Sequence, residues 1–164
     1  MATQETRYYL EMVHPSDLRP SSQMPAGVEV KPHTAAAPGL SRYLYTDVGK
    51  DWHWIDRLHW TPDQWQVYLQ QPHIESWVAY LQGATAGYFE LAIDSKYEVE
   101  IAYFGLLPRF IGRGLGGYLL TVAAERAWEI SASRVWVHTS TRDHPHALAN
   151  YQARGFRLFK QERL

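Results

Sequence analysis

In several short stretches, apolar and aromatic residues cluster or alternate with polar residues, a pattern that predicts strands with one buried face. These stretches are residues 7–12, 28–32, 75–81, 86–93, 98–107, 134–139 and 156–160. Helical signals predict helices at residues 38–45, 61–70, 114–130 and 145–154. The clearest start is Thr61-Pro-Asp-Gln64, which has a threonine N-cap, a proline at the first helical position and a glutamine at the capping-box position. Residues 14–27 have loop composition, and residues 51–60 show no regular pattern.

A glycine-rich turn joins the strand at 98–107 to the longest predicted helix. Its sequence runs Gly105-Leu-Leu-Pro-Arg-Phe-Ile-Gly-Arg-Gly-Leu-Gly-Gly117. Glycines have no Cβ, so the backbone at Gly112, Gly114, Gly116 and Gly117 can turn sharply and approach a ligand closely. The first amides of the following helix have no intrahelical partner, and the positive end of its dipole points the same way. We therefore predict a phosphate-binding cradle here.

Length and composition narrow the function further. The chain has 164 residues, a formal charge of −1 and no cysteine. We expect one domain over residues 1–164. The lack of a basic excess disfavours nucleic acid, and the lack of a run of about 18 apolar residues disfavours a membrane span. Without cysteine there is neither a thiol nucleophile nor a thiolate metal site, and a reducing cytoplasm is the expected location.

Two common phosphate ligands do not suit the motif. Gly112-x-Gly114-x-x-Gly117 matches the dinucleotide fingerprint, but the turn lies two-thirds along the chain. The next strand, 134–139, contains no acid to hold a ribose. The turn also lacks the Gly-Lys-Ser/Thr of a nucleoside triphosphate loop. A nicotinamide enzyme therefore stays only a minor alternative.

Two motifs carry a resemblance to a known family. Leu106, Pro108, Gly114 and Gly116 fit the pattern apolar-x-Pro-x-x-Gln/Arg-x-x-Gly-x-Gly/Ala, with Ile111 in place of Gln or Arg. Residues 147–156 fit Ala-x-x-x-Tyr-x-x-x-Gly-Phe. Over about residues 75–160 the chain resembles the GNAT superfamily of acetyl-coenzyme A-dependent N-acetyltransferases. The resemblance implies an α/β fold of the α+β type, with a mixed, mostly antiparallel central sheet flanked by helices.

The resemblance also implies a coenzyme A site. In such proteins two central strands splay apart, the pantetheine arm pairs with the exposed strand edge, and amides of the glycine turn hold the pyrophosphate. A backbone amide at the end of the 98–107 strand, that of Leu106, would stabilise the oxyanion. His144 stands where the family often has an asparagine that contacts coenzyme A. The implied cofactor-binding residues are Phe104, Gly105, Leu106, Gly112, Arg113, Gly114, Leu115, Gly116, Gly117 and His144.

Three residues are candidates for the chemistry. Glu100 lies eleven positions before Ile111, the spacing of the glutamate base in the histone-acetylating branch of the family; otherwise it is a solvent-facing strand acid. His138 ends the strand after the long helix and is the alternative base, with water a third option. Tyr151 would protonate the leaving thiolate, or else it is a core tyrosine. Without a cysteine, direct attack in a ternary complex is expected.

Two further groups of residues have competing interpretations. Trp52, Trp54, Trp60 and Trp65 lie where family members build the acceptor pocket, although core packing or a dimer surface is favoured. The spacing His53-x-x-Asp56-x-x-His59 allows a metal ligand set, but the segment has no other helix signal, so no metal is predicted.

The sequence thus predicts an N-acetyltransferase that moves an acetyl group from acetyl-CoA to a primary amine of a small molecule or peptide. The alternative from another class is a non-catalytic coenzyme A-binding module with a sensing or regulatory role. The acceptor, the acyl-chain preference and a homodimeric state are left open.

Overall fold

The computed structural model describes residues 4–33 and 37–164. Its strands are β1 (Thr6–Met12), β2 (Val28–His33), β3 (Ile74–Leu81), β4 (Ala84–Ile93), β5 (Glu98–Leu106), β6 (Arg134–Ser140) and β7 (Arg157–Arg163). Its α-helices are α1 (Pro38–Gly49), α2 (Pro62–Leu69), α3 (Leu115–Glu129) and α4 (Ala147–Ala153). Every predicted element is present, with ends that differ by a few residues. At the start of α2 the predicted capping box forms, because Gln64 N donates to Thr61 Oγ1 at 3.2 Å and Thr61 N donates to Gln64 Oε1 at 2.8 Å.

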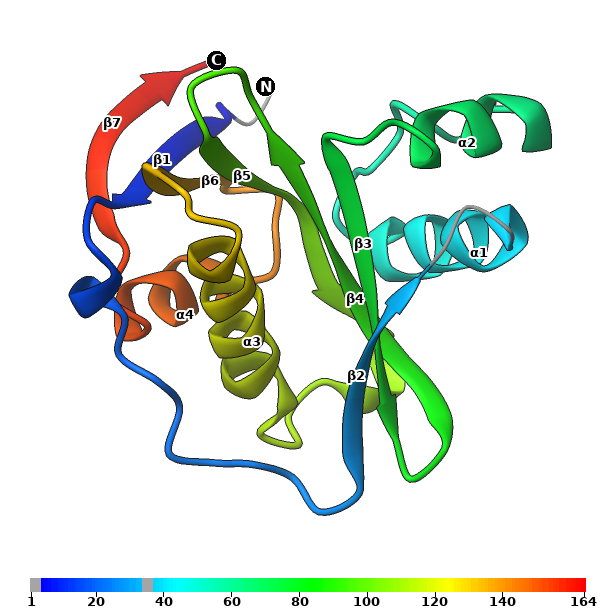
Figure 1. The fold of residues 1–164 in the computed structure, drawn as a ribbon, viewed down its shortest axis with the longest axis horizontal. Helices are drawn as coiled ribbons and strands as arrows, with labels where there is room; N and C mark the ends of the chain where they lie inside the picture. The colour runs from blue at the N-terminus through cyan, green and yellow to red at the C-terminus, as the bar shows by residue number, and fades with distance from the viewer. Residues whose placement is uncertain (1–3, 34–36) are drawn as a thin grey trace.

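The strands form one seven-stranded sheet in the order β2-β3-β4-β5-β6-β1-β7. Only the β5–β6 pair is parallel, and the other neighbours are antiparallel. The prediction of a mixed, mostly antiparallel sheet is therefore confirmed. The N-terminal strand β1 lies between β6 and β7, which brings the two chain ends together (Figure 1). Leu164 N donates to Glu5 O at 2.8 Å.

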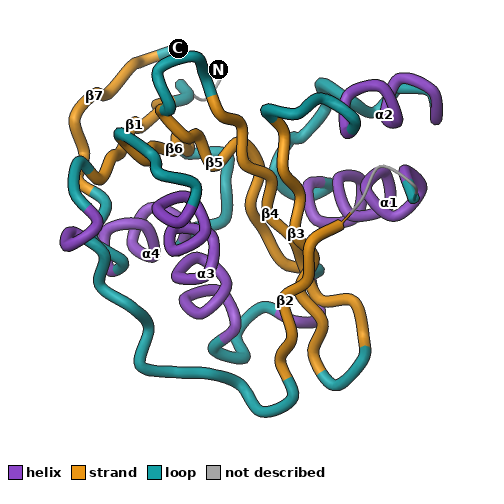
Figure 2. Tube along the Cα trace, viewed as in Figure 1, coloured by secondary structure: helices purple, strands orange, loops and turns teal. Residues whose placement is uncertain are grey.

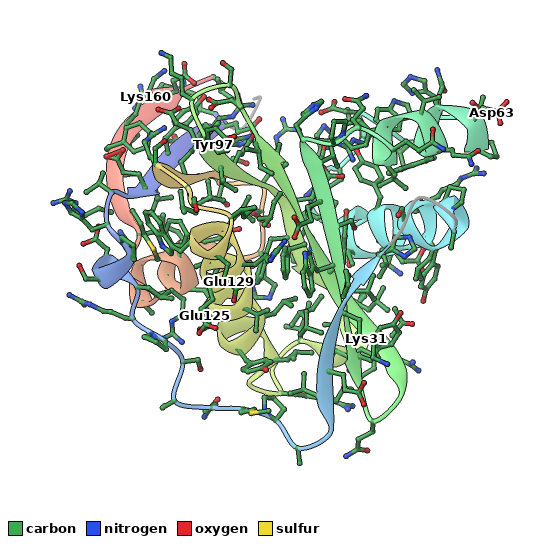
Figure 3. The ribbon with its side chains drawn as sticks, in the orientation of Figure 1. Lys31, Asp63, Tyr97, Glu125, Glu129 and Lys160 are labelled. Carbon is green, nitrogen blue, oxygen red and sulfur yellow. The ribbon has the colours of Figure 1, made fainter. Side chains whose placement is uncertain are left out.

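Helices α3 and α4 lie on one side of the sheet, and α1 and α2 lie on the other (Figure 1). The buried side of α3 contains Leu119, Leu120, Ala123, Ala124 and Ala127, none of which is exposed. They pack with residues of β1, β4, β5 and β6 in the larger core cluster. Glu125 and Glu129, one turn apart, lie on the outer side of the same helix (Figure 3). The buried side of α3 holds the helix against the sheet, and the short glycine turn after β5 places the N-terminus of α3 near the end of that strand.

The smaller core cluster lies on the other side of the sheet. There Leu44 and Val48 of α1 pack with Val78 and Tyr88 of the sheet. Helix α1 is four residues longer than predicted and ends at Gly49. Residues 51–60 follow it as a series of turns without a regular helix or strand (Figure 2). They connect α1 to α2 and lie next to the functional site described below.

The connection between β1 and β2 begins with a 3-10 turn at Pro15–Asp17 and runs past α3 as an extended loop (Figure 2). Ser21 N donates to Thr121 Oγ1 of α3 at 2.9 Å, which attaches the loop to the helix. The loop ends in edge strand β2, where Pro32 is tolerated because one side of the strand needs no ladder hydrogen bonds.

Candidate functional site

Strands β5 and β6 separate from each other partway along their length. Their parallel ladder pairs Glu98, Val99 and Glu100 with residues 134–136 and goes no further. Strand β5 nevertheless continues to Leu106 and β6 to Ser140. Beyond Glu100 the two strands diverge and open a wedge in the sheet, as the family resemblance implied. Backbone groups on the inner edges of the wedge have no strand partner and are free to bind a ligand.

A first cavity of about 690 Å³ lies between the end of β5, the glycine turn and the loop before α4. Seven of the ten predicted cofactor-binding residues line it: Phe104, Gly105, Leu106, Gly112, Gly116, Gly117 and His144. Ile111 lines it as well. Gly105 sits under α1, where a β-carbon would collide with the side chain of Val48. A larger residue here would have to displace Val48, which lines the cavity.

The other three predicted residues are not among those that line it. Gly114 is the N-cap of α3 with φ +78°, and a β-carbon there would lie 2.6 Å from Gln23 Oε1. The Leu115 side chain is fully buried in the core, so only its backbone amide is available to a ligand. Arg113 is exposed, with its guanidinium carbon 5.4 Å from the centre of the Phe110 ring. Their roles in binding stay predictions.

The glycine turn presents the start of α3 to the first cavity. Gly112 has φ +85°, a left-handed conformation that L-residues with side chains adopt only at a cost. A β-carbon at Gly117 would lie 2.9 Å from Nη1 of Arg154. A guanidinium therefore lies beside the helix N-terminus and adds positive charge where the helix dipole already favours an anion. Arg154 belongs to the distant 147–156 motif, and nothing in the sequence predicted its place beside the glycine turn.

A second, smaller cavity of about 220 Å³ opens on the wedge from β1 and the 51–60 segment. The two cavities share four lining residues: Trp52, Phe104, Asp143 and Tyr151. They therefore meet at the wedge. A donor in the first cavity and an acceptor in the second would approach each other at this junction.

Tyr151 lies at the junction, on α4. Its side chain is buried, and its ring centre lies 6.2 Å from that of Phe104. Burial, with a smaller contribution from the charge of Asp143, raises the pKa of Tyr151 well above that of a free phenol. The hydroxyl therefore stays protonated at neutral pH, which is the state that a proton donor needs.

The two candidate bases lie close together. His138 Nε2 is 3.7 Å from Glu100 Oε2, and His138 lines the second cavity. Burial and the negative charge of Glu90 raise the pKa of Glu100. The His138 side chain is 41% exposed, yet desolvation by the groups packed around it and the positive charge of Arg7 lower its pKa, so its imidazole is mostly neutral at pH 7. The structure thus brings together the two residues that sequence analysis treated as rivals.

The Leu106 amide faces the wedge. Leu107 N donates to Ala86 O on β4 at 2.8 Å. In an antiparallel strand successive N–H groups point to opposite edges. The N–H of Leu106, which pairs with Gly87 in the register, therefore points away from β4 and toward the separated edge. This orientation suits a donor for an oxyanion.

The tryptophan cluster divides into two parts. Trp60 and Trp65 pack against each other with ring centres 4.9 Å apart, and Trp65 is only 2% exposed. Trp52 and Trp54 instead line the second cavity, and Trp52 also contacts His144, with ring centres 5.1 Å apart. Core packing is therefore confirmed for Trp60 and Trp65, whereas an acceptor-pocket role for Trp52 and Trp54 stays a prediction.

A buried ion pair fixes the 51–60 segment to the sheet. Arg57 Nη1 and Nη2 donate to Glu90 Oε1 and Oε2 at 2.9 and 3.1 Å, and the Tyr68 hydroxyl donates to Glu90 Oε2 at 2.9 Å. The Arg57 guanidinium carbon lies 4.3 to 5.9 Å from the centres of five aromatic rings: Tyr45, Trp60, Trp65, Tyr68 and Tyr103. The sequence gives no signal for this pair, because its members are 33 residues apart and no local pattern connects them.

Two absences are observed over the described parts of the chain. Residues 4–33 and 37–164 contain no group of three histidine, aspartate or glutamate side chains placed to hold a metal ion, so His53, Asp56 and His59 do not converge. Over the same residues, no helix combines the length and the apolar character that a membrane crossing requires.

The sheet, the glycine turn and the two joined cavities define the class of fold: a mixed sheet with a split pair of strands that leads into a glycine turn at a helix N-terminus. The Acetyltransferase (GNAT) family profile matches residues 41–156. The chain therefore belongs to the GNAT family of acyltransferase enzymes. No curated protein is similar enough in sequence to count as a relative.

Solved structures share the fold at low sequence identity. A GCN5-related N-acetyltransferase from Sphaerobacter thermophilus has a TM-score of 0.72 at 16% identity, over 98% of this chain and 50% of that one. An IAA acetyltransferase from Bacillus cereus has a TM-score of 0.61 at 24% identity, over 81% and 79%. An aminoglycoside acetyltransferase from a soil metagenome has a TM-score of 0.67 at 16% identity, over 77% and 86%. The chain spans 50–60% of the length of three matches, of which the Sphaerobacter thermophilus protein is one.

Family members generally use acetyl-CoA, and the residues present fit that cosubstrate. The open β5 edge can pair with an amide-bearing arm, and the helix N-terminus with Arg154 can receive a phosphate. The absence of side chains at Gly112 and Gly116 leaves room in the cavity for the rest of the molecule.

Proposed function

We propose that this protein transfers an acetyl group from acetyl-CoA to a primary amine by direct attack in a ternary complex. The observation that carries the proposal is the meeting of the two cavities at the β5–β6 wedge, with Tyr151 at the junction. The cosubstrate supplies a thioester, whose carbonyl carbon is open to attack by a neutral amine.

The first cavity binds and orients the donor. Amides at the start of α3, reached through Gly112–Gly117, and the Arg154 guanidinium hold the pyrophosphate. The separated edge of β5 aligns the pantetheine arm. The Leu106 N–H donates a hydrogen bond to the thioester oxygen as negative charge develops on it. His144 borders the same cavity. The Nδ1 atom of His144 accepts a hydrogen bond from His146 N at 3.0 Å, so in the neutral ring Nε2 of His144 carries the proton and can donate it to a ligand.

The second cavity binds the amine. Glu100 takes the amine proton, directly or through water, with His138 as the neighbour that can share it. The amine nitrogen forms a bond to the carbonyl carbon and the carbon–sulfur bond breaks. Tyr151 gives its hydroxyl proton to the departing sulfur, and the proton taken from the amine restores the phenol through water. The products are an acetamide and the free thiol.

A thiol-release assay tests the proposal. The protein is incubated with acetyl-CoA and a panel of polyamines, aminoglycosides, amino acids and peptide N-termini, alongside Tyr151→Phe. We expect turnover with at least one acceptor, and a fall in kcat of about 10²- to 10⁴-fold in Tyr151→Phe, the usual contribution of a general acid. The phenylalanine keeps the ring that packs near Phe104, so the fold is preserved.

Calorimetry with coenzyme A separates the ways in which the assay could fail. Binding of coenzyme A without turnover on any amine would favour a sensing or regulatory module. Absence of both binding and turnover would exclude a coenzyme A-dependent function. Full activity in Tyr151→Phe would move the proton donor elsewhere.

A further inference from the structure

Most charged groups around the second cavity are paired, hydrogen-bonded or screened by water. Glu5 and Arg142 form an ion pair at 3.1 Å. Asp143 accepts hydrogen bonds from Thr139 Oγ1 at 2.6 Å and from His144 N at 2.7 Å. Asp56 is exposed, so water screens its charge. One further lining charge, the guanidinium of Arg7, is treated below.

Arg7 is a half-buried cation that forms no ion pair with any described residue. Over residues 4–33 and 37–164, no carboxylate oxygen lies within the 4.0 Å of an ion pair to its guanidinium, and the other six residues carry no acidic side chain. The charge of Arg7 helps to lower the pKa of Glu162, its register neighbour on β7. The carboxylate of Glu162 is nevertheless engaged by closer groups: Tyr9 Oη donates to Oε1 at 2.6 Å, and Lys160 Nζ lies 3.8 Å from Oε2. Burying a cation with no partner costs solvation energy that a bound anion would restore.

Arg7 also lies next to the candidate bases. On β6, Ser140 is opposite Arg7 and His138 is opposite Tyr9, so His138 is the diagonal neighbour of Arg7. Diagonal neighbours on one face of a sheet are about 7 to 8 Å apart, within reach of an arginine side chain. A ligand anion at Arg7 would therefore sit a few bond lengths from an amine at His138 and Glu100.

We propose that Arg7 binds a carboxylate of the acceptor, which makes the acceptor an amino acid-like amine with its carboxylate close to the reacting nitrogen. This inference rests on the proposed acetyl transfer. Arginine matches a carboxylate with two parallel hydrogen bonds, which fixes the acceptor's orientation. Trp52, Trp54 and Tyr103 line the same cavity and accept the apolar remainder of the acceptor.

Matched pairs of acceptors test the assignment. With saturating acetyl-CoA, kcat/KM is measured for glycine, L-methionine and L-phenylalanine and for their amides, which lack the carboxylate charge. The ratio of acid to amide is then compared between the wild type and Arg7→Gln. This comparison cancels the different basicity of the two amines. We expect the ratio to fall about 10- to 100-fold in Arg7→Gln, the usual effect of a lost charged hydrogen bond, and to recover in part in Arg7→Lys.

Controls keep the result interpretable. Arg163→Gln removes the same charge from β7, outside the cavity, and should leave the ratio unchanged. Equal urea midpoints for Arg7→Gln and the wild type show that the fold is intact. An unchanged ratio in Arg7→Gln would overturn the assignment, and so would turnover confined to polyamines or aminoglycosides, although acetyl transfer itself would stand. Silence with every amine would instead remove the proposed function, and this inference with it.

Discussion

Removing one member of the buried Arg57–Glu90 pair should cost much of the protein's stability. Glu90 is 1% exposed and Arg57 8% exposed. In Glu90→Gln the side chain keeps its size, but the guanidinium loses its counter-charge while it stays enclosed by aromatic rings. Breaking a buried pair from one side costs about 3 to 5 kcal/mol, because an uncompensated charge is left inside the protein. Some of this cost is relieved by the aromatic faces, which attract the cation.

Urea unfolding followed by tryptophan fluorescence measures the effect, since the chain has seven tryptophans. A loss of about 3 to 5 kcal/mol corresponds to a fall in Tm of roughly 6 to 20 °C for a chain of this length. The double variant Arg57→Met/Glu90→Leu replaces both charges by apolar groups of similar size and should be clearly more stable than Glu90→Gln. Glu29→Gln is the matched control, because Glu29 pairs with Lys31 at 3.0 Å on the surface and its loss should be too small to measure.

The reasoning would be refuted by a Glu90→Gln variant that unfolds within about 0.5 kcal/mol of the wild type, the range of an ordinary surface substitution. It would also fail if the double variant were as unstable as the single one. The first result would mean that the guanidinium reaches water or another partner when Glu90 is neutral. The second would mean that the loss comes from disturbed packing around the pair and not from an uncompensated charge.

Three further substitutions have expected outcomes. The folded-state pKa of Glu100 is raised, so its ionised form destabilises the fold at pH 7. Glu100→Gln should therefore raise the unfolding midpoint at pH 7, and this gain should shrink as the pH falls through the raised pKa toward the unfolded value near 4.3. A gain that does not change with pH would contradict this origin. Gly112→Ala should cost about 1 to 2 kcal/mol from its positive φ alone, because nothing lies within 4 Å of the added methyl group; a neutral result in urea unfolding would mean that the turn relaxes. Thr61→Ala removes the α2 cap and should lower the free energy of unfolding by about 1 kcal/mol in the same measurement. Thr61→Ser keeps a hydroxyl at the cap and should retain most of that stability.

Much of the fold could be predicted because its signals are local. The capping box at Thr61, the glycines between β5 and α3, and the alternation along the strands act over a few residues each. The candidate site was predictable only in part. Glu100, His138 and Tyr151 could be singled out one at a time, but their convergence required the sheet order. Arg7, Arg57 and Arg154 gave no sequence signal, because an arginine in a strand or loop is ordinarily solvated.

By itself, the sequence determined the type and order of the elements, the glycine turn at the start of α3 and the family to which the chain belongs. Tertiary structure decided where the elements go: β1 between β6 and β7, the wedge beyond Glu100, and the 51–60 segment held beside it by Glu90. The physical reason is the separation along the chain of the residues that interact. Backbone turns and caps are stabilised by neighbours along the chain, whereas strand pairing and buried charge pairs depend on residues that meet only when the whole sheet has formed.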